Sequence, residues 1–341
     1  MSRELSASPL AQLSEFHRVT PMLRFAVLLA LASSPIAAWA QVAPDVKVVF
    51  LRGTALMTAN TDGSNVKQLL DDGIAKAQPR WSPAGDKIVY QIAGQKTKDP
   101  KIHANLVIVT ATGVQLSTIP VFASEPDGTV IAGMRFVESS GWFGNDAVFA
   151  EGSANPYIGE YRKIDIHSGL VLQYYEGTSF ATCESQAKVA YELRTRYKSN
   201  DPAARLGYEL DVNGTAIYSN QPPPGVQEFG IGDLHWFAGC THLVFIENSD
   251  AIDTLVILSG ATVEAKIPFP ASVQWPLKFD PIGISLMIRS SSGGALFYGT
   301  TNHMLRPAPD ILQQLQQREN AEAQVMKTLG GQSPDWYRPS R

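Results

Sequence analysis

Residues 62–91 read DGSNVKQLLDDGIAKAQPRWSPAGDKIVYQ, a stretch with two tight turns that are each followed by apolar residues of strand length. Asp62, Gly63 and Gly85 supply the turn chemistry, because these residue types bond their own backbone or accept a positive φ. KIVY at 87–90 joins one polar residue to three residues that favour strands. The stretch therefore predicts two successive β-hairpins.

The KIVY pattern recurs along the chain. Matching segments, each with a polar start, strand-forming residues and a large apolar end, stand at 47–50, 87–90, 146–149, 188–191, 242–245 and 285–288. Successive copies begin 40, 59, 42, 54 and 43 residues apart. Several short strands within a period of about 40 to 60 residues are typical of β-propellers, in which each period forms one blade.

A second strand is expected after each copy. These segments are 54–63, 105–113, 160–169, 208–214, 254–261 and 294–302, and nearly all end in a turn that contains Gly with Asp, Asn, Ser or Thr. The residues before the KIVY strand recur as well: WSPAG at 81–85 has a counterpart in FDPIG at 279–283. We therefore count six copies of one unit.

The two ends of the repeat region are complementary. The first copy lacks the strands that should precede it, and the last, from Gly294, lacks a following KIVY strand. We therefore predict an all-β fold, a six-bladed β-propeller closed by the N-terminal strand, which would complete the last blade and remove exposed sheet edges. Seven blades would fit if the interval 87–146 holds an extra half-blade. A two-sheet sandwich gives no reason for complementary ends.

The repeat resembles the WD40-like PD40 repeat of TolB-type six-bladed propellers. The matching positions are Asn60, Asp62, Gly63, Trp81, Ser82, Pro83, Gly85, Ile88 and Tyr90, and Ala84 replaces the Asp of that pattern. The resemblance covers about residues 46–307 and implies the propeller fold and an exported location. It does not extend to TolB's own role, because TolB carries an α/β domain before its propeller, whereas about five residues separate the predicted cleavage point from the first strand here.

The N-terminal region has the pattern of an export signal. Residues 24–41 read RFAVLLALASSPIAAWAQ, a basic flank, an apolar run and small residues at Ala38 and Ala40. We expect a signal peptide over 1–40 with cleavage after Ala40, with Met22 as an alternative start. The apolar run is short for a membrane span. The mature chain is therefore expected in the periplasm or secreted, without a transmembrane span.

Export affects the interpretation of the two cysteines, Cys183 and Cys240. An oxidising compartment permits a disulfide between them, and two buried free thiols are the alternative.

Residues 308–341 are expected to form a C-terminal helix and tail, with the helix over about 310–329 between Pro309 and Gly330. Its apolar stripe predicts packing on the propeller. A helix that binds a partner or dimerises is the other interpretation.

Few residues point to chemistry. The chain carries a formal charge of −4 without a basic block, which does not favour nucleic acid. No nucleophile elbow, HExxH or phosphate-binding loop is present. A zinc site at His235, Cys240 and His242 would still need a distant ligand. We therefore predict no catalytic residue, no metal and no cofactor, and expect Asp62 to serve its own turn rather than calcium.

The tryptophans before the KIVY strands are expected to pack between blades. This applies to Trp81, Trp142, Trp236 and Trp275, although the small and polar residues around Trp142 are also typical of an exposed turn.

Two long basic loops follow equivalent strands, at 94–105 and 194–205. Loops at equivalent positions of a repeat emerge on one face. We expect them to form a basic rim for an anionic ligand or partner, with solvated loops as the alternative; its residues are Lys96, Lys98, Lys101, Arg194, Arg196, Lys198 and Arg205.

The repeat and the missing motifs together favour an exported, non-catalytic propeller that serves as a protein interaction scaffold or envelope-associated binding module. Its partner is expected to be another envelope or periplasmic protein. The alternative is an enzyme, a hydrolase or lyase, or a ligand- or metal-binding module, with a site assembled from several blades at the mouth of the central channel.

Overall fold

A computed structural model describes most of the chain beyond the N-terminal region. The described residues are 47–92, 102–122, 136–155, 158–194, 207–220, 229–249, 253–268, 277–282, 284–290, 295–302 and 304–337. All of them belong to the unit formed by Asp45–Arg341. Within these residues, no helix is both long and apolar enough to cross a lipid bilayer.

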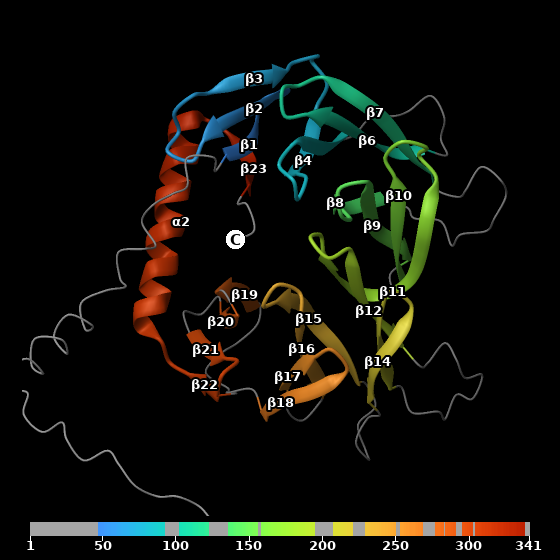
Figure 1. Ribbon diagram of the computed structural model, residues 1–341, viewed down its shortest axis with the longest axis vertical. Helices are drawn as coiled ribbons and strands as arrows, with labels where there is room; N and C mark the ends of the chain where they lie inside the picture. The colour runs from blue at the N-terminus through green and yellow to red at the C-terminus, as the bar shows by residue number, and fades with distance from the viewer. Residues whose placement is uncertain are drawn as a thin grey trace, which may run out of the picture. The chain divides into compact units, whose positions relative to one another are not determined.

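Antiparallel sheets follow one another along the chain, and Figure 1 shows them arranged around a common centre. The first sheet consists of β23 (Gln332–Tyr337), β1 (Lys47–Arg52), β2 (Ala55–Asn60) and β3 (Lys67–Leu70), in that order. The second consists of β4 (Lys76–Trp81), β5 (Lys87–Ile92), β6 (Ile102–Thr110) and β7 (Gln115–Phe122).

The third sheet has seven strands but contains two four-stranded groups. Its strands are β8 (Phe136–Trp142), β9 (Ala147–Asn155), β10 (Ile158–Asp165), β11 (Val171–Cys183), β12 (Lys188–Arg194), β13 (Tyr208–Val212) and β14 (Thr215–Asn220). The long strand β11 belongs to both groups, because it pairs with β10 up to Gly177 and with β12 from Thr178 onward.

Two further four-stranded sheets complete the series. One holds β15 (Phe229–Phe237), β16 (His242–Ser249), β17 (Thr254–Ser259) and β18 (Thr262–Pro268). The other holds β19 (Leu277–Ile282), β20 (Ser285–Ser290), β21 (Ala295–Gly299) and β22 (Met304–Arg306). A series of four-stranded antiparallel sheets around a centre is the architecture of a β-propeller.

The predicted repeat is confirmed at the level of strands. The six KIVY segments lie in β1, β5, β9, β12, β16 and β20, and the six segments expected after them lie in β2, β6, β10, β13, β17 and β21. These are the two middle strands of each four-stranded group. Their apolar residues fill the cores between neighbouring sheets: for example, Val89 and Ile108 of the second sheet pack with Val148 and Ile164 of the third.

The expectation that the N-terminal strand completes the last blade is wrong for the described strands. The last sheet has four strands of its own, and β1 pairs instead with β2 and with β23 from the C-terminal segment. The segment 308–341 is therefore more than a helix and tail. Its strand escaped prediction because QSPDWY has no alternating apolar pattern and contains a proline.

The helix α2 (Pro309–Leu329) connects the last sheet to the first. Near its start, Leu315 packs on Met287 and Phe297 of the last sheet. Near its end, Met326 and Leu329 pack in the core of the first sheet. The predicted packing of the apolar stripe is thus present, and α2 occupies the space between these two sheets in Figure 1.

Polar contacts fix the middle and the C-terminal end of α2. Glu319 accepts hydrogen bonds from Lys278 and Arg289, while the Arg52 guanidinium donates to the Leu329 carbonyl, with Nε at 2.9 Å. Gly330 ends the helix with a φ of +61°, the left-handed conformation that glycine adopts without a steric cost. The chain then turns directly into β23.

Candidate functional site

The residues of the repeat motif serve the fold locally. The Asp62 carboxylate accepts the Ser64 backbone N–H at 2.8 Å, and bonds to Ser64 lower the pKa of Asp62. Gly63 has a φ of +82°. Ser82 Oγ donates to Asp86 at 2.9 Å and accepts the backbone N–H of the following strand's first residue. Each polar group is therefore used within its own turn.

The other motif residues lie where sheets meet. Trp81 packs in the core between the first and second sheets. Pro83 borders the cavity described below. Gly85, with a φ of +70°, faces the ring of Tyr337 so closely that a Cβ at this position would overlap the ring. The motif thus helps to hold the C-terminal strand against the second sheet.

Trp142 is fully buried and does not lie in an exposed turn. Its indole Nε1 donates to the Arg80 carbonyl on β4 at 3.1 Å. Trp236 repeats this contact two groups later, since its Nε1 donates to the Ala181 carbonyl on β11 at 3.0 Å. These two tryptophans therefore link β8 to β4 and β15 to β11. Trp275 lies outside the described residues.

We call the first strand of each four-stranded group its inner strand. Four inner strands, β4, β11, β15 and β23, contain a bulge that the sequence analysis did not predict. Gln78, Ser179, Asp233 and Ser333 have φ values of +49°, +55°, +50° and +51°, and a register shift occurs at each of these places. A bulge of this kind redirects the side chains that follow it.

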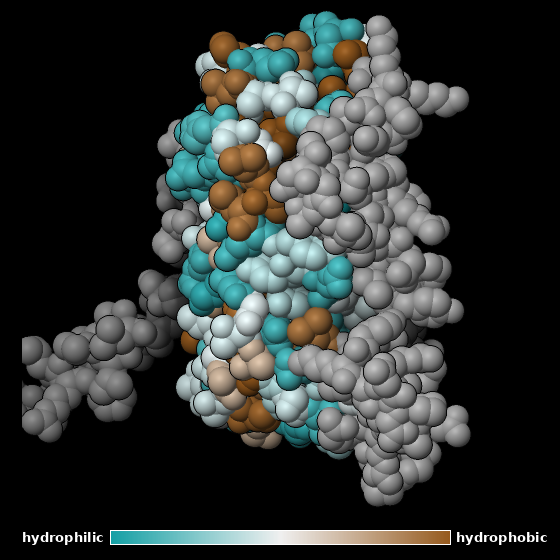
Figure 2. Space-filling view, turned by 90° about the vertical axis from the view of Figure 1, so that its right-hand side faces the viewer, coloured by the Kyte–Doolittle hydropathy of each residue, from teal (hydrophilic) through white to brown (hydrophobic). Residues whose placement is uncertain are grey.

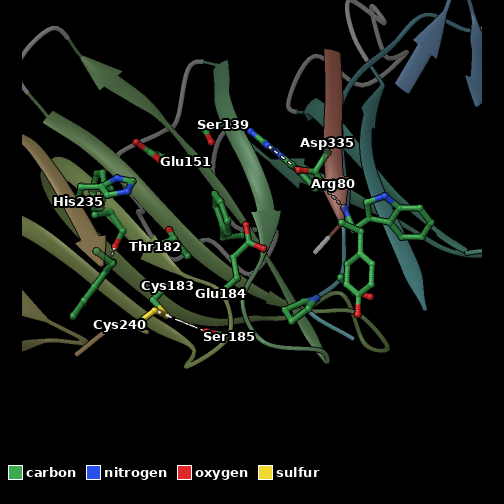
Figure 3. Close-up of a pocket in the computed structure, with 18 of the residues that line it drawn as sticks. Arg80, Ser139, Glu151, Thr182, Cys183, Glu184, Ser185, His235, Cys240 and Asp335 are labelled. Atoms are coloured by element: carbon green, nitrogen blue, oxygen red, sulfur yellow. Dashed lines mark hydrogen bonds and ion pairs between the residues drawn. A yellow bond between two sulfur atoms is a disulfide. The ribbon is translucent and has the colours of Figure 1, made fainter. Parts of the chain in front are cut away.

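Arg80, His235 and Asp335 each lie two residues after the positive-φ residue of one of these bulges. All three line one cavity. The cavity measures about 730 Å³. Its wall comes from β4, β8, β9, β11, β15 and β23 and from the turns next to them. Figure 3 shows Arg80 and Asp335 on one side of it, His235 on the other, and Glu184 between them.

Arg80 and Asp335 form an ion pair across this wall. Arg80 Nη1 lies 3.3 Å from Asp335 Oδ1, and the other carboxylate oxygen accepts the Trp81 backbone N–H at 2.7 Å. Because Asp335 belongs to β23 and Arg80 to β4, the pair joins the C-terminal strand to the second sheet.

Glu184 lies at the end of β11, and its half-buried carboxyl has no hydrogen-bond or ion-pair partner among the described residues. It lies against Gly141, where an added Cβ would stand 3.3 Å from Oε1 of Glu184 and 2.7 Å from the Phe149 ring. Burial, and next the nearby Asp335 carboxylate, raises the pKa of Glu184 to about 7, while Arg80 opposes this effect.

Glu151 is a second half-buried carboxyl on the cavity wall without a partner among the described residues. Burial, and next the Glu138 carboxylate, raises its pKa to about 7. Its cross-strand neighbour is Tyr161, whose phenol accepts a hydrogen bond from Thr182 Oγ1 at 3.1 Å. Glu151 and Glu184 both contribute to raising the pKa of Tyr161, so both carboxyls lie within electrostatic reach of one phenol.

His235 is the titratable group on the opposite side. Its ring stacks on Phe279, with centroids 6.1 Å apart and planes at 20°. Burial lowers the pKa of His235, although Asp280 acts in the other direction. The imidazole is therefore neutral at pH 7 and adds no positive charge to the cavity.

Cys183 and Cys240 form a disulfide at the edge of this cavity, with Cα atoms 6.0 Å apart. It ties the end of β11 to the turn after β15. His242, the third residue of the zinc hypothesis, instead contacts Glu264 at 3.2 Å. Over the described ranges, no group of three or more His, Cys, Asp or Glu is arranged to hold a metal ion.

Glu247 carries a buried carboxylate outside the cavity. Glu247 accepts the hydroxyls of Tyr208 and Tyr218, both at 2.6 Å, and the amide of Asn220 at 2.7 Å. These three partners lie on β13 and β14, whereas Glu247 lies on β16 of the next sheet. The cluster therefore links two neighbouring sheets.

The predicted basic rim lies almost entirely outside the described residues. Only Arg194 falls within them, as the last residue of β12. The structure therefore neither groups these residues nor separates them.

The cavity as a whole could not be found from a motif, since its residues come from six different strands and the turns next to them. One signal was nevertheless present: Ser-Pro-Asp-Trp at 333–336 corresponds to Gln-Pro-Arg-Trp at 78–81. This correspondence would have identified β23 as an inner strand and Asp335 as the counterpart of Arg80.

No protein-family model matches the sequence. No curated protein matches it either. Among solved structures, the chain is similar to the β-propeller domain of the Trilobed protease from Pyrococcus furiosus, at 12% identity and a TM-score of 0.46 over 77% of this chain and 81% of that one. It is also similar to TolB from Acinetobacter baumannii, at 14% identity and a TM-score of 0.41 over 83% of this chain and 67% of that one.

A further similarity is to an acylaminoacyl peptidase from Pyrococcus horikoshii, at 13% identity and a TM-score of 0.41. It covers 72% of this chain but 38% of the peptidase. Since the named proteins include both a protease domain and TolB, these likenesses do not assign an activity to this chain.

Proposed function

We propose that the chain is an exported, non-catalytic β-propeller that binds a segment of a partner protein in its central cavity. We further propose six TolB-type blades, counting the seven-stranded sheet as two. The ring would be closed by β23, which adds a strand from the C-terminal segment to the sheet of β1.

The observation that supports binding is the cavity itself. It lies where inner strands from several sheets converge, and about 730 Å³ is within the size range of ligand sites. Its wall combines aromatic rings with two carboxyls, those of Glu151 and Glu184, that have no partner among the described residues. Such groups are costly to bury unless something else bonds to them.

The partner is proposed to be an envelope or periplasmic protein, following the export signal expected at residues 1–40. Fractionation of cells that express the chain tests this location. Recovery of an unprocessed chain in the cytoplasm alone would contradict it.

The binding proposal is tested by blocking the cavity without changing its charge. Ser139 lines the cavity, so Ser139→Trp should fill part of it. Ser219 is exposed on β14, and Ser219→Trp is the matched control. Each purified variant is used to capture proteins from envelope extract. A protein that is captured by the wild type and by the Ser219 variant, but not by the Ser139 variant, supports the proposal. Equal capture by both variants contradicts it.

An enzyme is the second candidate, and one observation favours it. Glu151 and Glu184 both have pKa values raised to about 7, where a carboxyl can act as general acid or base. Turnover of a glycan or peptide substrate that is abolished in both Glu151→Gln and Glu184→Gln would favour this function over binding alone.

A further inference from the structure

We infer that the central cavity binds an organic cation, an ammonium or guanidinium group, between Glu151 and Glu184. This inference rests on the proposed function, because it names the chemistry of the group that enters the cavity.

The charge balance of the wall leads to a cation. Arg80 is already paired with Asp335, and His235 is neutral at pH 7. The carboxyls of Glu151 and Glu184 have no hydrogen-bond or ion-pair partner in the described part of the chain. A half-buried carboxylate is stabilised strongly by an opposite charge that enters the same site. An anionic ligand would instead face two carboxyls with no free cation among the described wall residues.

The surroundings favour an organic cation over a metal ion. Calcium and magnesium require about six oxygen ligands, and no group of three or more suitable side chains exists among the described residues. The wall also carries the rings of Phe149, Phe180, Trp236 and Trp336. Aromatic faces attract ammonium and guanidinium groups and pack against the apolar stem that carries them.

The two carboxyls lie on the same part of the wall: a Cβ at Gly141 would stand 3.3 Å from Oε1 of Glu184 and 2.7 Å from the Phe149 ring, and Phe149 is two residues from Glu151 on β9. Both influence the phenol of Tyr161, which is fully buried between β9 and β11. Thr182 holds the Tyr161 hydroxyl in place and also lines the cavity. A single cationic group at this part of the wall would therefore be attracted by both Glu151 and Glu184.

Binding of a cation should depend on pH. Glu138 lies near Glu151, and both Asp335 and Arg80 lie near Glu184; burial is the largest influence on each carboxyl. Because both groups are half protonated near pH 7, a bound cation displaces protons. Affinity should fall by about tenfold for each contributing carboxylate as the pH is lowered from 8 to 6.

Calorimetric titration of the purified chain tests the inference. The probes are the peptide Ac-Ala-Lys-Ala-NH2, the same peptide with an acetylated lysine side chain, and spermidine. We expect saturable binding of the charged peptide or of spermidine at pH 8, at least tenfold weaker binding at pH 6, and none of the acetylated peptide. Tighter binding of the peptide assigns the cation to a protein side chain, and tighter binding of spermidine assigns it to a free amine.

Variants localise the site. Glu151→Gln and Glu184→Gln should each weaken binding at least tenfold at pH 8. Glu176→Gln, an exposed carboxyl on β11, should leave it unchanged. Equal binding of the acetylated peptide, or unchanged binding in both cavity variants, overturns the inference, as does the absence of any saturable binding. If Ser139→Trp loses the partner protein while the two Glu→Gln variants retain it, the proposed function stands and only the cationic ligand is rejected.

Discussion

Replacing Glu184 by Gln should remove part of the pH dependence of stability. The folded protein raises the pKa of this carboxyl from 4.5 to about 7, chiefly because the group is buried and next because Asp335 is near. Between these two pH values the folded state binds more protons than the unfolded state. The free energy of unfolding therefore decreases as the pH rises through this window, and levels off above about pH 8.

The size of the effect follows from the pKa difference. One such group changes the free energy of unfolding by about 2 to 3 kcal/mol between pH 5 and pH 8. Glu184→Gln keeps the shape of the side chain but cannot ionise. It should therefore unfold at a higher urea concentration than the wild type at pH 8, and at nearly the same concentration at pH 5.

Urea unfolding followed by tryptophan fluorescence at pH 5, 6, 7 and 8 measures this slope. Glu151→Gln should behave in the same way, since its pKa is also raised to about 7. Glu176→Gln, the exposed control, should retain the wild-type slope. An unchanged slope in Glu184→Gln would show that this carboxyl is ionised at neutral pH, and would refute the reasoning about its environment.

Three further predictions concern the contacts between sheets. Replacing Cys183 and Cys240 by Ala opens a link over 57 residues and should reduce the free energy of unfolding by up to about 4 kcal/mol, measured as a lower guanidinium midpoint than that of the oxidised wild type; equal midpoints would contradict this. Trp142→Phe leaves the Arg80 carbonyl without its indole donor and should cost about 1 to 3 kcal/mol, measured in the same way. Deleting residues 332–341 exposes an edge of the first sheet and should lower the melting temperature or cause aggregation, whereas deleting only the last four residues should not; equal melting temperatures would show that β23 adds no stability.

The strands were predictable because their signal is local. Each KIVY segment is a short run of strand-forming residues that follows a turn. The predicted segments are the middle strands of their sheets, which pair with a neighbouring strand on both sides. The helix was predictable for the same reason: its expected start at 310 and end at 329 differ from Pro309–Leu329 by one residue.

The inner strands were harder to recognise. Their bulges interrupt the alternation of apolar and polar residues, and their polar positions, such as Arg80 and Asp335, line the cavity. Trp142 packs between two sheets, as expected for the tryptophans before the KIVY strands, and the small residues around it, which resemble a turn, allow the ring to pack inside. Gly141 in particular leaves room for the Phe149 ring and for Glu184.

The site could not be predicted because it exists only after folding. Along the chain, β10 and β11 lie between Glu151 and Glu184. No sequence motif at either residue predicts a binding site. Their chemistry comes from burial and from neighbours on other strands. Among the described residues that Figure 2 shows, hydrophobic residues form separate groups among hydrophilic ones.

The most direct test of partner binding in the cavity is photo-crosslinking in intact cells. A benzoylphenylalanine placed at Ser139 faces the cavity, and one placed at Ser219 lies on an outer strand. The account predicts a crosslinked adduct with a specific envelope or periplasmic protein from position 139 and none from position 219. An adduct from position 219 alone, or from neither position, would contradict it.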